Sequence, residues 1–213
     1  MGGYMTSFED SVLLLPAGEN LWDGNVDPAY RGFGSQFGGW TGAALLKAAM
    51  PEPGSNGGPL SLSVLFIEAV GEGPFQVSTR LLRSGARLQF WRSELVQRDR
   101  VCAHAQATFG VRRETTRFTD AIMPEVPPPD TEGLFKWAPP PGFGAQYEMR
   151  WITPPPRSPK ADPKMPASSL VWVQDHAARP LDLLQLAAMA DLAPPRVIWK
   201  RDMISGSSTV SMT

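Results

Sequence analysis

The feature that most constrains the fold is an almost uncharged segment, "FGGWTGAALLKAAM", from Phe37 to Met50, in which Lys47 is the only charged residue. Apolar residues recur at helical spacing along one face, and the other face is mostly glycine and alanine. A helix that is apolar on nearly all sides has to be buried by its neighbours. The sequence therefore predicts a central buried helix that begins at Gly38 and Gly39.

The segments after this helix are rich in branched and aromatic residues and are separated by tight turns. They predict an antiparallel meander over residues 60–70, 75–82, 87–97 and 101–111. Another strand is expected before the helix, at residues 11–18, followed by a stretch of turns. A curved antiparallel sheet wrapped around the helix would bury it, which is an α+β arrangement.

The chain contains 22 prolines, and they cluster most densely between about residues 123 and 166. Polyproline segments are extended and enter neither helices nor central strands. We therefore expect a linker at 119–166 with at most one strand, "AQYEMRWI". This linker would separate a first domain, residues 1–118, from a second domain, residues 167–213.

The second part of the chain begins like the first. A strand is expected at residues 169–176, a helix at 180–195 and another strand at 207–213. The triplet "AAM" stands near the end of both predicted helices, which indicates an internal repeat. A full copy of the first domain would need three further strands, so the second domain is expected to be truncated.

Composition narrows the possible partners. The formal net charge of −1 shows no basic surplus, so no nucleic-acid partner is expected. The single cysteine, Cys102, excludes an internal disulfide and fits a reducing, cytoplasmic setting. The longest apolar runs fall short of the roughly 20 residues that a membrane span needs. With two histidines and no acid cluster, no metal site is expected.

The organisation resembles the double-hotdog acyl-CoA thioesterases, the thioesterase II-like family. "QFGGWTGAALLKAA" is similar to the Phe-Gly-Gly helix start of that family, and "PLDLLQLAAMADLAPP" to its second-domain helix. "SGSSTVSMT" is similar to the strand that carries a catalytic Thr or Ser. The resemblance implies a tandem hotdog fold and hydrolysis of fatty acyl-CoA to free fatty acid and CoA. It also implies that no cofactor is needed and that the protein forms a homodimer or a larger homo-oligomer.

The same resemblance implies the catalytic residues. It places the acid that activates water on Asp191 and the hydroxyl on Thr209, and a glutamine beyond Thr213. The residues alone say less about Asp191. It stands near a helix C-terminus, where the helix dipole disfavours a carboxylate, and an acid in such a place is a candidate functional group. The alternative is a partly exposed acid at a fraying helix end.

Thr209 has an ordinary alternative too, as a strand threonine, and the role could move to Ser207, Ser208 or Ser211. Backbone N–H groups of Gly38 and Gly39 could stabilise the negative charge that thioester hydrolysis places on the carbonyl oxygen. This hypothesis requires a cavity between the helix and Asp191. Otherwise the two glycines serve only tight turning and close packing.

Other candidates are weaker. Glu52 is a rival acid, because matching the two "AAM" triplets places it opposite Asp191. Cys102 and His104 would face the same side of a strand, which suggests a nucleophile pair, although free cysteine is usually a small buried residue. His176 is expected at the surface. The arginines of the meander are expected on a solvated face and could alternatively meet CoA phosphates: Arg80, Arg83, Arg87, Arg92, Arg98 and Arg100.

Two other functions compete with hydrolysis. One is a non-catalytic acyl-thioester-binding protein that keeps the pocket without the chemistry. The other is a hotdog dehydratase or hydratase, which needs a histidine paired with an acid. Neither histidine stands on a predicted helix.

Overall fold

The computed structural model describes residues 7–50, 57–136, 142–153, 168–177, 179–194 and 209–213. Its elements in chain order are α1 (Phe8–Ser11), β1 (Leu14–Gly18), β2 (Leu21–Asn25), the 3₁₀ helix η1 (Pro28–Tyr30), α2 (Gly38–Ala49), β3 (Gly58–Phe66), β4 (Pro74–Ser84), β5 (Leu88–Gln97), β6 (Arg100–Gly110), β7 (Phe135–Lys136), the 3₁₀ helix η2 (Phe143–Gln146), β8 (Tyr147–Trp151), β9 (Val171–Asp175), α3 (Leu183–Met189) and β10 (Ser211–Met212).

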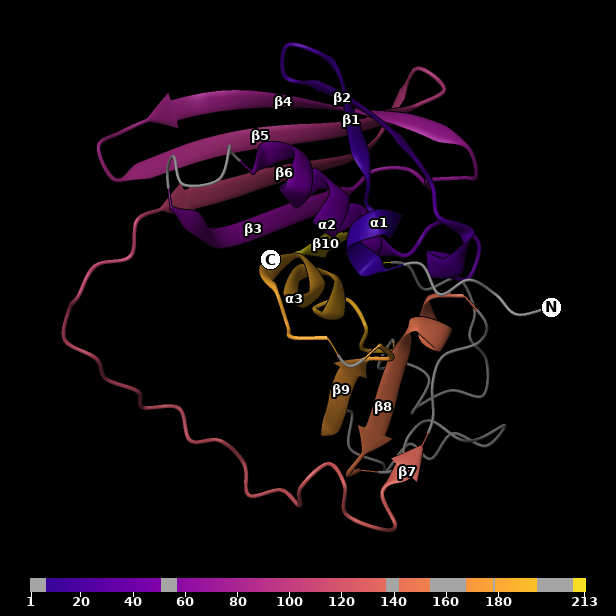
Figure 1. Cartoon of the computed structure of the whole chain (residues 1–213), viewed down its shortest axis with the longest axis vertical. Coiled ribbons are helices and arrows are strands. Elements are labelled where there is room, and N and C mark those ends of the chain that lie inside the picture. The colour runs from indigo at the N-terminus through magenta and orange to yellow at the C-terminus, as the bar shows by residue number, and fades with distance from the viewer. Residues whose placement is uncertain (1–6, 51–56, 137–141, 154–167, 178, 195–208) are drawn as a thin grey trace.

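The strands form two antiparallel sheets. The larger has the order β1-β2-β4-β5-β6-β3-β10, and the smaller has the order β7-β8-β9. In Figure 1, α2 lies against one face of the larger sheet, and α3 lies beside α2 on the side of the smaller sheet. The molecule is therefore an α+β structure with helix packed on antiparallel sheet, as the sequence predicts.

The central helix is confirmed. Ten of the twelve residues of α2 are buried, and Trp40, Ala44 and Leu45 have no exposed surface. They pack against Val77 of β4 and other residues of the sheet in one continuous core. Burial of this apolar surface is the main stabilising contribution to the fold.

The predicted meander is only partly correct. β4, β5 and β6 pair in sequence order, but β3 pairs with β6 and not with β4. The chain after β3 crosses the end of the sheet instead of making a tight turn. The side chain of Gln97 in β5 holds this crossing, because it accepts a hydrogen bond from the Gly71 N–H and donates one to the Gly71 oxygen.

The start of the chain also differs from the prediction. The strand expected at residues 11–18 begins only at Leu14, because Ser7 caps the short helix α1. β2 was missed, since its Asp-Gly pair is typical of a turn. The structure shows another reason for this glycine: a Cβ on Gly24 would lie 2.3 Å from the ring of Phe75.

Within the predicted linker the structure contains two strands, β7 and β8, so the expectation of at most one is wrong. The expected strand in "AQYEMRWI" is confirmed as β8. The predicted helix at 180–195 is shorter, since Asp182 has an extended backbone and caps α3 from outside. β10 pairs with β3 and so extends the larger sheet, not the smaller one.

The internal repeat is visible in how the two parts meet. A Cβ on Gly39, at the start of α2, would lie 2.2 Å from the oxygen of Ala188, near the end of α3. Near the other end of α2, Leu46 and Ala49 pack against Leu184 of α3, so the helices are antiparallel. β3 follows α2 as β10 follows α3, and these strands are antiparallel as well.

Candidate active site

The N-terminus of α2 lacks a cap from its own side chains. Phe37 occupies the N-cap position and makes no side-chain cap hydrogen bond. Its N–H donates to the Tyr30 oxygen at 3.0 Å, and its ring stacks on Phe143 of η2 with the centroids 4.2 Å apart. Contacts from both parts of the chain therefore fix where α2 begins.

Asp191 supplies the missing cap from another element. It lies just after the C-cap of α3, and the N–H of Gly39 hydrogen-bonds to its carboxylate. A Cβ on Gly38 would lie 2.5 Å from Asp191 Oδ2, so only glycine permits this approach. The positive end of the α2 dipole stabilises the nearby negative charge.

The Thr209 side chain also contacts the Asp191 carboxylate. Its Oγ1 donates a hydrogen bond to Asp191 Oδ1 at 3.0 Å. The next residue, Val210, accepts a hydrogen bond from the Phe66 N–H at 2.9 Å, which holds this segment at the edge of β3. The structure thus brings together Gly38, Gly39, Asp191 and Thr209, which are more than 150 positions apart at the extremes.

The electrostatics of Asp191 combine opposing effects. Burial raises the pKa of the carboxyl group above its usual value, whereas the hydrogen bonds from Thr209 and Gly39 lower it; the net pKa is raised. A carboxylate with a raised pKa that is held by two donors can orient a water molecule and accept its proton.

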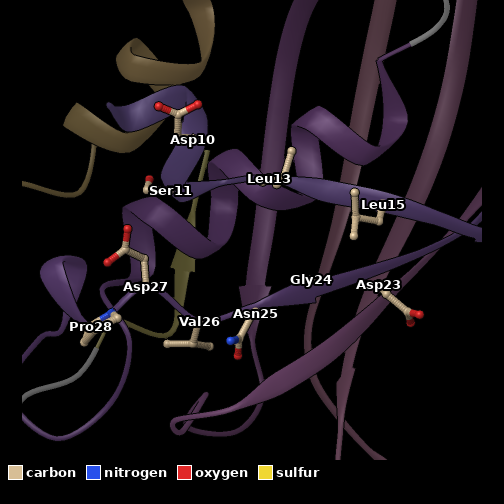
Figure 2. Close-up of a pocket in the computed structure, with 10 residues that line it drawn as sticks. All are labelled: Asp10, Ser11, Leu13, Leu15, Asp23, Gly24, Asn25, Val26, Asp27 and Pro28. Carbon is tan, nitrogen blue, oxygen red and sulfur yellow. The ribbon is translucent and has the colours of Figure 1, made fainter. Parts of the chain in front are cut away.

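Asp191 Oδ2 packs directly on Gly38. The expected cavity between α2 and Asp191 stays a prediction, because residues 195–208, directly before Thr209, lie outside the described part of the chain. Described residues line a hollow of about 450 Å³ between α1, β1 and β2 (Figure 2) and a smaller one of about 30 Å³ near Gly34 and Glu72. Neither is lined by Asp191 or Thr209.

The structure gives little support to the other candidate site residues named from the sequence. Glu52 lies outside the described residues. Cys102 is buried, and burial raises the pKa of its thiol, which disfavours the reactive thiolate. His176 is exposed, as expected. Among the described residues no cluster of three potential metal ligands occurs. The six arginines of the meander are exposed, in agreement with a solvated face.

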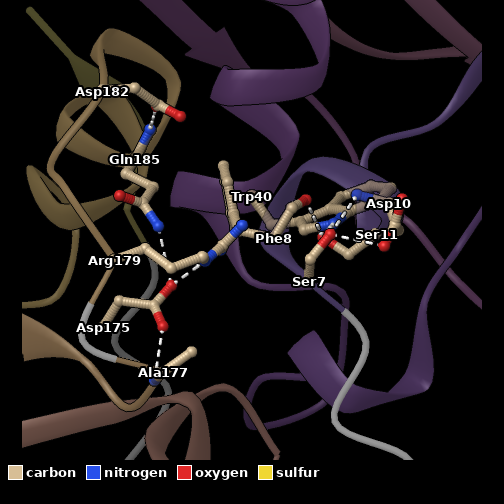
Figure 3. Close-up of polar contacts among 10 residues, drawn as sticks. All are labelled: Ser7, Phe8, Asp10, Ser11, Trp40, Asp175, Ala177, Arg179, Asp182 and Gln185. Atoms are coloured by element: carbon tan, nitrogen blue, oxygen red, sulfur yellow. Dashed lines mark hydrogen bonds and ion pairs between the residues drawn. The ribbon is translucent and has the colours of Figure 1, made fainter.

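One polar cluster was not anticipated (Figure 3). Asp175, at the end of β9, is 7% exposed and accepts hydrogen bonds from Gln185 Nε2 at 2.7 Å, Arg179 Nη2 at 3.0 Å and the Ala177 N–H at 2.7 Å. Burial of Tyr30 itself, and after it the negative charge of Asp175, raises the pKa of Tyr30, which belongs to the first part of the chain. The only sequence signal was an acid at the end of the apolar strand "LVWVQD".

Two family models match consecutive parts of this chain. The acyl-CoA thioesterase N-terminal domain matches residues 27–110, and the acyl-CoA thioesterase C-terminal domain matches residues 120–213. The chain belongs to the acyl-CoA thioesterase family. The family predicted from the sequence is confirmed, and the match to the thioesterase C-terminal domain begins inside the predicted linker.

Solved structures support the tandem hotdog fold of this thioesterase family member. A conserved protein of unknown function with a hot dog fold from Alicyclobacillus acidocaldarius is 32% identical, with a TM-score of 0.85; the match covers 97% of this chain and 76% of that one. An acyl-CoA thioesterase II from Mycobacterium marinum is 24% identical, with a TM-score of 0.65, over 87% of this chain and 68% of that one.

A comparison with curated proteins gave no match. In the described part of this thioesterase family member, no helix combines the length and the apolar character needed to cross a membrane.

Proposed function

We propose that this protein hydrolyses acyl-CoA thioesters to free acids and CoA, with Asp191 and Thr209 activating the attacking water. The observation that carries the proposal is the contact of the Asp191 carboxylate with both Thr209 Oγ1 and the glycine start of α2. Membership of the acyl-CoA thioesterase family supports acyl-CoA as the substrate.

In the proposed mechanism, Thr209 Oγ1 donates to Asp191 and can still accept a hydrogen bond from a water. Asp191 accepts a proton from this water as its oxygen attacks the thioester carbon. The carbon–sulfur bond then breaks, the acid is released, and the CoA sulfur takes up the proton that Asp191 received.

During the attack, negative charge develops on the thioester carbonyl oxygen, and a hydrogen-bond donor is needed to stabilise it. The N–H of Gly39 already serves the Asp191 carboxylate, whereas the N–H of Gly38 has no acceptor among the described residues. Gly38 at the positive end of α2 is therefore the proposed oxyanion donor, and the role of Gly39 is to hold Asp191.

The experiment is thiol release from acyl-CoAs of graded chain length. We expect Asp191→Asn to lower kcat by about 10²- to 10⁴-fold, as loss of a general base does. Thr209→Val should lower it as well, and Thr209→Ser should keep most of the activity. The matched control is Asp182→Asn, which neutralises an acid at the other end of α3 and keeps its cap.

An acyl-thioester-binding protein without turnover is the alternative, and one observation favours it: Asp191 also acts as the cap of α2. Tight acyl-CoA binding with no thiol release from the wild-type protein would select this alternative. Thiol release that Asp191→Asn leaves unchanged would remove the proposed roles of Asp191 and Thr209.

A further inference from the structure

The larger hollow has an apolar surface with an acidic rim (Figure 2). Leu13 and Leu15 line it and are 56% and 59% exposed. Asp10, Asp23 and Asp27 line it as well, and no lysine or arginine does. The hydrogen bonds described for these carboxylates come only from neutral groups: the Ser7 hydroxyl, the Gln76 amide and the Ala29 N–H.

A second unusual feature is the segment after β6, residues 111–123, here called the arm. It forms no helix or strand, and every residue in it is exposed. Phe118 and Ile122 are 83% and 91% exposed. Arg112, Arg113 and Arg117 have no ion-pair partner among the described residues, and they outnumber the two acids of the arm, Glu114 and Asp120.

The arm and the hollow complement each other in two respects. The arm offers cations and a large exposed aromatic side chain, and the hollow offers carboxylates around exposed leucines. Complementary charge guides association, and large exposed apolar groups mark interaction surfaces. A volume of about 450 Å³ is large enough for an aromatic side chain with its neighbours.

The arm is placed to reach another molecule. In Figure 1 it leaves the sheet at the end of β6 and arches away from the body, whereas α1, β1 and β2 lie on the opposite side. Both ends of the arm are anchored, at β6 and at the β7 region. The hollow of its own chain is therefore not beside it.

We propose that the arm of one molecule docks into the hollow of a second copy of this chain. Phe118 packs on Leu13 and Leu15, and the arm arginines pair with Asp10, Asp23 and Asp27. The same contact made in both directions gives a symmetric pair, the usual form of homodimers. This inference does not depend on the hydrolysis proposed above.

Two single-cysteine additions test the contact directly. Leu15→Cys and Phe118→Cys alter exposed side chains, and the native Cys102 is buried, so it does not compete. We expect a disulfide-linked heterodimer when the two variants are mixed and oxidised, and at least tenfold less of it from either variant alone. The matched control pairs Phe118→Cys with Phe90→Cys, whose side chain is 37% exposed outside the hollow, and should give no such product.

Charge variants extend the test. Arg112→Glu, Arg113→Glu and Arg117→Glu, introduced together with Phe118→Cys, should reduce cross-linking at least tenfold, and Asp23→Lys in the partner variant should restore part of it. Absence of the heterodimer, or cross-linking that the charge reversal does not change, overturns the proposal. An intrachain disulfide in a monomeric Leu15→Cys/Phe118→Cys double variant also overturns it, because the arm would then occupy its own hollow.

Discussion

At the scale of single residues, Asp191 combines a structural and a chemical property. Its carboxylate caps the start of α2 and also carries a hydrogen bond from Thr209. Both contacts depend on the absence of a side chain at Gly38, where a Cβ would lie 2.5 Å from Asp191 Oδ2 and 3.2 Å from the ring of Phe66. The geometry of the candidate site is therefore sensitive to one methyl group.

Gly38→Ala should lower kcat/KM at least tenfold, because the Asp191 carboxylate has to move, and small displacements of catalytic groups are costly. The measurement is thiol release at several acyl-CoA concentrations. Gly42→Ala is the control in the same helix, since its Cβ would lie 2.9 Å from the flexible end of Met212 and at an ordinary contact distance of 3.5 Å from Val64. The prediction is wrong if both variants retain full activity.

The raised pKa of Asp191 predicts how stability depends on pH. The folded state favours the protonated carboxyl, so this contribution to stability is fully present below the ordinary aspartate pKa of about 3.9 and is lost as the pH rises through the higher folded value. The free energy of unfolding of wild type relative to Asp191→Asn should therefore fall as the pH rises. Denaturant titrations at a series of pH values measure it, and a flat or opposite trend contradicts the raised pKa.

At the scale of elements, the residues that cap the helix N-termini decide where the helices begin. Asp182 caps α3 by accepting a hydrogen bond from the Gln185 N–H at 2.7 Å, so the helix is shorter than its apolar pattern suggested. α2 has no such cap of its own and takes one from Asp191. The first feature could be read from the local sequence, and the second requires a residue far away in the chain.

Asp182→Ala should destabilise the protein by about 1 kcal/mol, the usual effect of losing an N-cap side chain. Asp182→Asn should cost much less, because an asparagine oxygen can accept the same hydrogen bond. Chemical denaturation of the three proteins measures the difference. Equal stability of Asp182→Ala and Asp182→Asn would show that the cap contributes nothing.

At the scale of the whole molecule, the cluster around Asp175 joins the two parts of the chain. Gln185 from α3 and Arg179 donate to its carboxylate, and Tyr30 from the first part lies within its electrostatic influence. A buried carboxylate is tolerated because its hydrogen-bond donors compensate its charge. Removing the Asp175 carboxylate leaves these donors without their acceptor.

Asp175→Ala should therefore destabilise the fold by about 1–3 kcal/mol, because it leaves the buried Gln185 amide without its acceptor, whereas the Arg179 side chain is 31% exposed and can be solvated. Glu148→Ala is the surface control, since its ion pair with Arg150 is exposed by more than a quarter on both sides and should contribute below about 1 kcal/mol. Thermal and denaturant unfolding measure both variants. Similar losses in the two variants would contradict a special role for the Asp175 cluster.

By itself, the sequence determined the central helix and three consecutive strands of the sheet, because these follow from local periodicity and turn signals. The candidate site residues came from the resemblance to a known family and stay predictions. The tertiary structure decided that β3 pairs with β6, that β10 joins the larger sheet and that β2 contains a glycine beneath Phe75. It also decided that Asp191 caps α2. Each of these depends on which surfaces meet across long sequence separations, and local patterns carry no information about that.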